Sequence, residues 1–160
     1  MKRDDLHGLR LSNPIHFVAV GFGSGLASKA PGTFGTLAAV PFYYLMSFLS
    51  LDIYIVILVA SSLLGFWLCH ITSRDMGVHD HKSIVWDEFV GYWITMVMVP
   101  FSIKWAIVGF VLFRFFDIIK PYPISWLDKK VGGGLGIMID DIVAGLFSAI
   151  VLQFLIHLYG

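Results

Sequence analysis

The sequence predicts an all-α membrane protein: a polytopic helix bundle with about four to five short transmembrane helices, preceded by an N-terminal re-entrant or interfacial segment. Of its 160 residues, 58% are hydrophobic and 14% are charged, whereas soluble domains are about 45–50% apolar. The apolar residues form runs that approach the roughly 20 residues a helix needs to cross a bilayer. The length is typical of one domain, so we expect residues 1–160 to form a single integral-membrane unit.

The first apolar stretch, from Ile15 to Val20, runs into the glycine-rich sequence GFGSGLASKAPGTFGT. It is too short and too rich in glycine to span a bilayer, which favours a re-entrant or interfacial segment. Lys29, Gly32 and Thr33 offer an ammonium group, a backbone N–H group and a hydroxyl group, which together could bind a phosphate. The segment is not a P-loop, because no GKS or GKT follows at the required spacing.

Five apolar segments follow, and we expect them to form the transmembrane helices: residues 35–51, 53–71, 89–101, 103–119 and 142–159. The first two make a hairpin around Asp52. A single helix over residues 89–119 would be about 46 Å long at 1.5 Å per residue, too long for a hydrocarbon core about 30 Å thick. Pro100, Ser102 and Lys104 provide a natural break between two shorter helices.

Charged residues are distributed unequally between the two sides of this predicted bundle. Five segments place the N-terminus and the stretches 72–88 and 120–141 on one side. With Arg114 included, that side holds ten of the eleven lysines and arginines, and only Lys104 lies opposite. The positive-inside rule makes this side cytoplasmic, and all acids except Asp52 share it.

Net charge and cysteine content exclude several function classes. Basic and acidic residues number eleven each, so no overall field attracts nucleic acid, and we expect a membrane partner and no nucleic acid. Cys69 is the only cysteine, which excludes an internal disulfide and a cysteine-rich zinc site. The sequence makes no prediction of oligomeric state.

Five carboxylates stand at the ends of apolar segments: Asp87, Glu88, Asp117, Asp140 and Asp141. A carboxylate beside hydrocarbon is costly to keep charged, so such residues predict a functional site by default. Oxygen ligands without cysteine point to a hard cation such as Mg²⁺. We therefore expect these five residues to bind Mg²⁺ and to take part in catalysis.

Helix capping is the alternative for the two adjacent pairs, Asp87 with Glu88 and Asp140 with Asp141, the latter expected to begin the last helix. Asp is favoured at an N-cap, and acids suit the positive end of the helix dipole. One cap needs one acid, so capping leaves the second member of each pair unexplained. Gly91, in the first of these motifs, would permit close approach of another helix. The glycines of GGGLG, residues 132–136, taken alone predict a flexible turn.

Asp117 and Lys120 are three residues apart and would share a helix face, while Pro121 is expected to end the helix at Lys120. An interfacial salt bridge with snorkelling basic side chains is the alternative, and it applies also to Arg114. In the more specific interpretation, Asp117 binds a metal ion and Lys120 binds a phosphate.

His79, Asp80 and His81 form a tight HDH cluster. Two neighbouring imidazoles rarely offer the geometry of a transition-metal site, so we predict loop residues. An acid or base role in protonating a leaving alkoxide stays open for one of them.

The strings VGFGSGL, PGTFGTLAAVP, MGVHDHKSIVWDEFVG, FRFFDIIKPYPI and GGGLGIMIDDIVAG follow one another from about Asn13 to Gly145. In this order they resemble the phosphatidylglycerophosphatase A family of bacterial inner-membrane enzymes. The resemblance implies Mg²⁺-dependent hydrolysis of phosphatidylglycerophosphate to phosphatidylglycerol and phosphate at a cytoplasm-facing site. By position, the family's acidic motifs fall on Asp87 and Glu88, Asp117 with Lys120, and Asp140 and Asp141, and its PGT loop falls on residues 31–33.

The resulting hypothesis is that three helix ends deliver carboxylates to one or two Mg²⁺ ions, while Lys120 and Lys29 neutralise phosphoryl oxygens. Either an activated water or an aspartate could attack the phosphorus. A small Mg²⁺ transporter or channel is the rival function, but it requires polar groups through the midplane. The centres of segments 53–71 and 142–159 contain almost none. A noncatalytic scaffold would leave the five acids unexplained.

Overall fold

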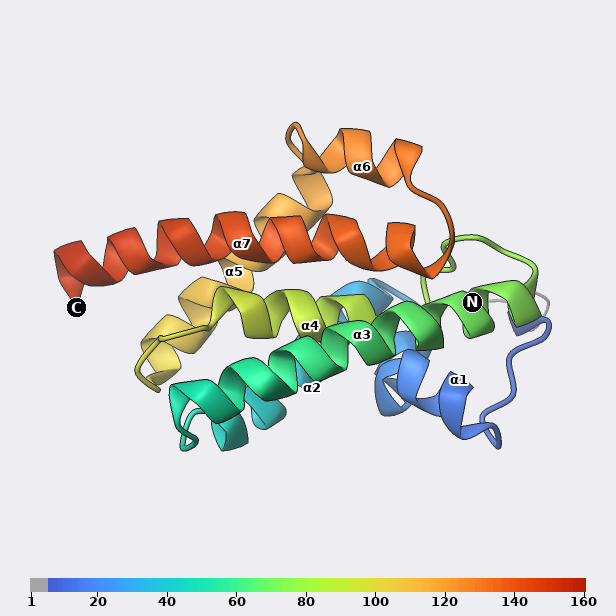
Figure 1. Ribbon diagram of the computed structural model, residues 1–160, viewed down its shortest axis with the longest axis horizontal. Helices are drawn as coiled ribbons and strands as arrows, with labels where there is room; N and C mark the ends of the chain where they lie inside the picture. The colour runs from blue at the N-terminus through green and yellow to red at the C-terminus, as the bar shows by residue number, and fades with distance from the viewer. Residues whose placement is uncertain (1–5) are drawn as a thin grey trace.

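The computed structural model describes residues 6–160, and every regular element in this part of the chain is a helix (Figure 1). The all-α prediction is confirmed. The elements are α1 (Pro14–Ala19), the 3₁₀ segment η2 (Gly21–Leu26), α2 (Pro31–Met46), α3 (Leu51–Met76), α4 (Trp86–Thr95), α5 (Ile103–Ile119), α6 (Ile124–Lys130) and α7 (Gly133–Tyr159). The terminal charges counted above, Lys2, Arg3, Asp4 and Asp5, lie outside the described residues.

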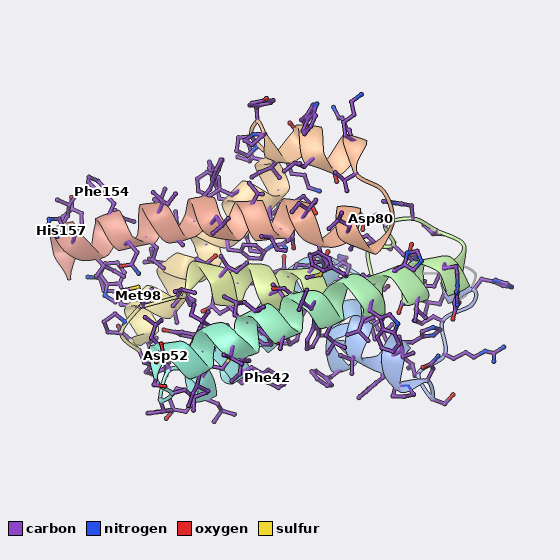
Figure 2. All side chains as sticks on the ribbon, viewed as in Figure 1. Phe42, Asp52, Asp80, Met98, Phe154 and His157 are labelled. Atoms are coloured by element: carbon purple, nitrogen blue, oxygen red, sulfur yellow. The ribbon has the colours of Figure 1, made fainter. Side chains whose placement is uncertain are left out.

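Successive long helices run in alternating directions along the bundle. Figure 1 shows the turns 47–50 and 96–102 at the same end as the C-terminus, whereas α1 and the connections from α3 to α4 and from α6 to α7 lie toward the other end. Figure 2 accordingly shows Asp52 and Asp80 far apart along the bundle. This arrangement matches the sidedness expected from the sequence, while the assignment of one side to the cytoplasm stays a prediction.

Two helices, α3 and α7, are long and apolar enough to cross a membrane, with 26 and 27 residues. Large apolar side chains are also exposed on the outside of the bundle, including Val56, Leu63, Ile107, Ile150 and Phe154, each more than half exposed. Contiguous apolar surface of this kind is rare on soluble monomers and suits contact with hydrocarbon. These features are those of a membrane protein; the count of four to five crossings and the re-entrant segment stay predictions.

Helix α4 is the centre of the bundle, and all ten of its residues are buried. It packs against α2, α3, α5 and α7. The Tyr54 hydroxyl donates to the Trp93 carbonyl at 2.7 Å and the Trp93 indole donates to the Ala39 carbonyl at 3.1 Å, so these two side chains join α4 to α3 and α2. The expected helix over 89–101 begins earlier, at Trp86, and ends at Thr95, and Met98 in the following turn has a positive φ of 60°.

Gly91 of α4 and Gly145 of α7 lie at a close helix crossing. A Cβ atom on Gly145 would stand 2.5 Å from the Gly91 carbonyl oxygen. The two backbones can approach this closely only because neither residue has a side chain. The role expected for Gly91 is confirmed, and this crossing holds the acid-bearing turns of the two helices together.

Helix α7 begins at Gly133, nine residues before the predicted segment. A Cβ atom on Gly134 would stand 2.1 Å from the Phe66 carbonyl oxygen, so this glycine lets α7 pack on α3. The prediction of a flexible turn over 132–136 is wrong for most of its length. The predicted hairpin position is also shifted, because α2 ends at Met46 and Asp52 lies in the first turn of α3.

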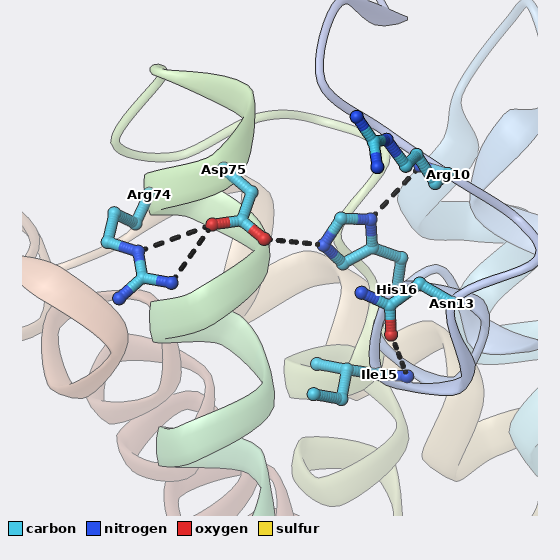
Figure 3. A network of polar contacts seen from close by, with 6 residues as sticks. All are labelled: Arg10, Asn13, Ile15, His16, Arg74 and Asp75. Carbon is cyan, nitrogen blue, oxygen red and sulfur yellow. Dashed lines mark hydrogen bonds and ion pairs between the residues drawn. The ribbon is translucent and has the colours of Figure 1, made fainter.

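Helix α1 is tied to the end of α3 by a buried histidine (Figure 3). The Nδ1 atom of His16 accepts a hydrogen bond from the backbone N–H of Arg10 at 3.0 Å, so its Nε2 atom donates to Asp75 at 3.2 Å. Asp75 also accepts from Arg74. This network fixes the N-terminal segment beside α3, from which the chain turns back toward the start of α2.

Candidate active site

The acidic motifs, far apart in the sequence, meet in one pocket of about 360 Å³. The pocket lies between the first turn of α2, the loop before α4, and helices α4, α5 and α7. Its walls contain all six residues predicted to be catalytic, and also Gly32, which was predicted to bind phosphate. The complete lining is Ala30, Pro31, Gly32, Asp80, Lys82, Ile84, Asp87, Glu88, Arg114, Asp117, Ile118, Lys120, Asp140 and Asp141.

Asp87 and Glu88 are the second and third residues of α4 and are 8% and 9% exposed. The N-cap position is occupied by Val85, and no side chain caps the helix by a hydrogen bond. Acids in a first turn still face the positive end of the helix dipole. Since α4 is enclosed by protein, this turn carries two carboxylates into the interior of the bundle.

Asp140 and Asp141 lie two turns inside α7, because the helix starts at Gly133. They are 5% and 3% exposed. Only the first four N–H groups of a helix lack intrahelical partners, so neither residue caps α7. The expectation that they begin the final helix is wrong, and capping accounts for neither acid.

Four carboxylate oxygens in this pocket are buried without a hydrogen-bond partner among the described residues: Asp87 Oδ1, Glu88 Oε2, Asp140 Oδ1 and Asp141 Oδ2. A buried polar atom that lacks a partner is destabilising, especially when the group is charged. One oxygen each from Asp87, Glu88 and Asp141 also lie within 4.8 Å of one another. Ligands on opposite sides of Mg²⁺ are about 4 Å apart. The donor set therefore fits a divalent cation that binds oxygen.

Arg114 also lines the pocket, although it was not among the predicted site residues. Its Nη1 atom lies 2.5 Å from Asp117 Oδ2 and 3.7 Å from Glu88 Oε1, with all three side chains at most 15% exposed. The guanidinium thus faces inward rather than snorkelling toward the membrane surface. The sequence could have indicated this position, because Arg114 is three residues from Asp117 and residues at i and i+3 share a helix face.

Helix α5 ends at Lys120, as expected for the residue before Pro121. Lys120 itself has a left-handed conformation, with φ 45° and ψ 57°. This backbone turn directs its ammonium group to Asp128 at 2.8 Å and Asp140 at 2.5 Å. The alternative of a salt bridge between Asp117 and Lys120 is therefore wrong, since Asp117 pairs with Arg114. Partial burial opposes the charged form of Lys120, but these two ion pairs outweigh it and raise the pKa of the lysine.

The HDH cluster lies in the loop between α3 and α4, as predicted, and its members have different roles. His79 Nε2 accepts from the backbone N–H of Gly133 at 2.6 Å, which joins this loop to the start of α7. Asp80 and Lys82 line the pocket. Burial raises the pKa of Asp80. The positive charge of Lys120 opposes this shift, and the negative charge of Asp128 adds to it.

Gly32 places the N-terminus of α2 against the acids. A Cβ atom there would stand 2.2 Å from Glu88 Oε1 and 3.0 Å from Arg114 Nη1, so any side chain would displace both groups. A helix N-terminus offers backbone N–H groups and a positive dipole end, which suit an anion. Lys29 and Thr33, the other predicted phosphate ligands, are not among the residues that line the pocket.

The pocket wall carries six carboxylates and three basic side chains. With every group ionised, its formal charge is −3, which would repel a phosphomonoester. Bound cations would reverse this repulsion and would also give partners to the buried carboxylate oxygens. The geometry thus suits a phosphate held between a helix N-terminus and metal ions.

Known proteins are similar to this chain over most of its length. The profile of the family described as Phosphatidylglycerophosphatase A matches residues 17–156. "Phosphatidylglycerophosphatase A" of Escherichia coli K12 is 55% identical over 150 residues, covering 93% of this chain and 87% of that protein. The protein of the same name from Haemophilus influenzae is 49% identical over 152 residues, covering 94% and 93%.

A third relative, from Bacteroides thetaiotaomicron, is named as a candidate phosphatidylinositol-3-phosphatase. It is 36% identical over 143 residues, covering 84% of this chain and 89% of that protein. No solved structure matches significantly. The family profile covers most of the chain, and two relatives with the same name are 55% and 49% identical to it. This chain therefore belongs to the phosphatidylglycerophosphatase A family and is a phosphatase.

Proposed function

We propose that this protein hydrolyses the terminal phosphomonoester of phosphatidylglycerophosphate, giving phosphatidylglycerol and phosphate, with Mg²⁺ as cofactor, at the cytoplasmic face of a bacterial inner membrane. The observation that carries the proposal is the set of four buried carboxylate oxygens that have no hydrogen-bond partner within residues 6–160, in a pocket that Gly32 of α2 also lines. The names of the two most similar relatives given above support the substrate.

Asp87, Glu88 and Asp141 would hold a Mg²⁺ ion, because their oxygens converge. Asp117 and Asp140 line the same pocket and complete the proposed metal-binding set. When bound there, Mg²⁺ would polarise the phosphoryl group and lower the pKa of a coordinated water.

The phosphoryl oxygens would contact the first turn of α2 at Gly32, together with Arg114 and Lys120. Arg114 presents a planar group that suits phosphate, and Lys120 supplies a charge held in place by Asp128 and Asp140. Lys29 and Thr33 stay predicted phosphate ligands, which would have to reach the pocket when substrate binds. Positioning and charge stabilisation of this kind account for most catalysis of phosphoryl transfer.

Departure of the phosphate leaves an alkoxide on the glycerol headgroup, which needs a proton. Asp80 is our proposed donor, since it lines the pocket and its raised pKa favours the protonated acid. Two routes for attack stay open, by water or by an aspartate. The two routes can be distinguished with substrate that carries a radioactive label at the terminal phosphate. If an aspartate attacks, acid quenching during turnover leaves labelled phosphate on the protein; if water attacks, it does not.

The rival function, Mg²⁺ transport, is less well supported. The five predicted site acids lie in one pocket, whereas a conduction path needs polar groups along its whole length. The central residues of α3 and α7 are almost entirely apolar.

The test is phosphate release by the purified protein from phosphatidylglycerophosphate, with phosphatidic acid and phosphatidylinositol 3-phosphate as competing substrates. We expect the highest kcat/KM for phosphatidylglycerophosphate. Preference for phosphatidylinositol 3-phosphate would overturn the substrate assignment. No hydrolysis of any lipid, combined with Mg²⁺ flux into liposomes that contain the protein, would favour the transporter.

A further inference from the structure

An apolar groove of about 380 Å³ lies on the outside of the bundle between α2 and α5. Its walls are Leu37, Pro41 and Tyr44 of α2 and Ile103, Ile107 and Phe110 of α5, with three other apolar residues. Leu37 is 55% exposed and Ile107 is 59% exposed, so the groove opens toward the surroundings of the bundle.

Helices α2 and α5 contribute to the walls of both the groove and the acidic pocket. On α5, groove residues Ile103, Ile107 and Phe110 continue at helical spacing into Arg114 and Asp117 of the pocket. Residues three and four apart share a face, so these side chains form one stripe with an apolar part and a charged part. Phe110 is about 6 Å along the helix from Arg114 at 1.5 Å per residue.

Helix α2 repeats this order. Gly32 borders the pocket, and Leu37, Pro41 and Tyr44 border the groove. From Gly32 to Tyr44 the helix rises about 18 Å, close to half of a hydrocarbon core about 30 Å thick. A phosphate at the pocket therefore has a path of about one leaflet in depth along the same two helices.

We infer that this groove binds an acyl chain of the lipid substrate while its phosphate occupies the acidic pocket. The inference rests on the proposed function and adds a subsite to it. An acyl chain is the occupant whose chemistry matches the whole stripe, since it is apolar, about one leaflet long and covalently joined to an anionic headgroup. The site would thus recognise a lipid by its chain as well as by its phosphate, rather than leave the chain in bulk bilayer.

The experiment compares wild type with Ile107→Trp, which fills the groove, and with Ile150→Trp as matched control. Ile150 is an exposed isoleucine of α7, 69% exposed, that lines neither groove nor pocket. Each protein is assayed in mixed micelles with dipalmitoyl and with dihexanoyl phosphatidylglycerophosphate, whose short chains would not reach past Phe110 to fill the groove.

We expect Ile107→Trp to lower kcat/KM for the dipalmitoyl lipid about 10-fold, in the range for altered fit in an apolar pocket, with kcat/KM for the dihexanoyl lipid unchanged. Ile150→Trp should match wild type on both. Equal loss on both lipids, no loss on either, or a change in oligomeric state caused by Ile107→Trp would overturn the inference. Failure of wild type to hydrolyse both lipids would instead overturn the proposed function.

A second measurement does not depend on turnover. Phosphatidylglycerophosphate with a photoreactive group at the end of one acyl chain is irradiated with the Asp141→Asn variant. We expect labelled peptides from α2 and α5, and suppression of that label by excess unlabelled substrate but not by phosphatidylethanolamine. Labelling spread evenly over the exposed faces of α3 and α7, or insensitive to substrate, would contradict the inference.

Discussion

The ammonium group of Lys120 lies 2.5 Å from Asp140 Oδ2 and 2.8 Å from Asp128 Oδ1. Twenty residues separate Lys120 from Asp140, so this contact joins the end of α5 to the acid-bearing turn of α7. We predict that Lys120→Met leaves both carboxylates without a counter-charge and removes the proposed contact with phosphate. Phosphatase activity should fall by more than about 100-fold, since a hydrogen bond to a charged group contributes roughly 1.5–3 kcal/mol. Lys129→Met, at an exposed site on α6, is the control and should keep wild-type activity. Comparable activity of Lys120→Met and Lys129→Met would remove Lys120 from the site.

Arg114 holds Asp117 and Glu88 in place. We predict that Arg114→Gln lowers kcat by about 100-fold, in line with the loss of one group that stabilises developing charge, and that Arg114→Lys recovers only part of it because an ammonium group cannot reproduce the planar guanidinium. Steady-state kinetics in Mg²⁺ measure both. The matched control is Arg74→Gln, because Arg74 is 67% exposed and, within residues 6–160, forms its ion pair with its neighbour Asp75. An Arg114→Gln variant as active as Arg74→Gln would show that the guanidinium has no part in the reaction.

The position of Gly32 leaves no space for a side chain. Gly32→Ala would place a methyl group 2.2 Å from Glu88 Oε1, and overpacking of this kind costs about 1–3 kcal/mol. We expect activity to fall about 10-fold to 100-fold, because Glu88 and Arg114 must move. Thermal unfolding in detergent should show that the protein stays folded. Wild-type kcat/KM in this variant would mean that the pocket accommodates the methyl group and that its geometry is less critical than described.

The crossing of α4 and α7 makes a prediction for stability. Alanine at Gly145 would bring its Cβ within 2.5 Å of the Gly91 carbonyl oxygen, which is backbone and cannot move aside. We expect Gly145→Ala to lower the unfolding temperature by about 5 °C, from a cost of about 1–3 kcal/mol at roughly 2–4 °C per kcal/mol. Leu146→Ala, one residue further on at a 49% exposed position, should change it much less. Equal shifts for the two variants would argue against a specific close contact.

Local pattern was sufficient for part of the fold. The apolar run 103–119 coincides with α5, and Pro121 marks its end at Lys120. The distribution of charged residues predicted that successive helices alternate in direction, because charged residues gather where the chain leaves hydrocarbon. The extents of α4 and α7 were mispredicted. Glycines 133, 134 and 136 looked like a turn from propensity alone, but all three lie in α7, where Gly134 packs against Phe66 and His70 of α3.

The members of the candidate site were mostly predictable, while their partners were not. Acids beside apolar segments were conspicuous because burial of a carboxylate needs a reason. The partner of each charge depends on backbone geometry that no short pattern records. Lys120 turns toward Asp140 because of its left-handed conformation, and Asp117 pairs instead with Arg114. Lys82 joins the pocket from a loop, where spacing carries no information about direction.

The central claim is that buried carboxylates from α4 and α7 bind the Mg²⁺ required for hydrolysis. The most direct measurement is phosphate release from phosphatidylglycerophosphate as a function of Mg²⁺ concentration, for wild type and Asp141→Asn, with chelator as the zero point. We predict no activity in chelator, recovery on addition of Mg²⁺, and for Asp141→Asn a higher Mg²⁺ requirement with a rate lowered by more than about 100-fold, since removing even an outer partner of a metal ligand costs roughly 10–100-fold. Full activity of wild type in chelator, or an unchanged Mg²⁺ dependence in Asp141→Asn, would contradict the claim.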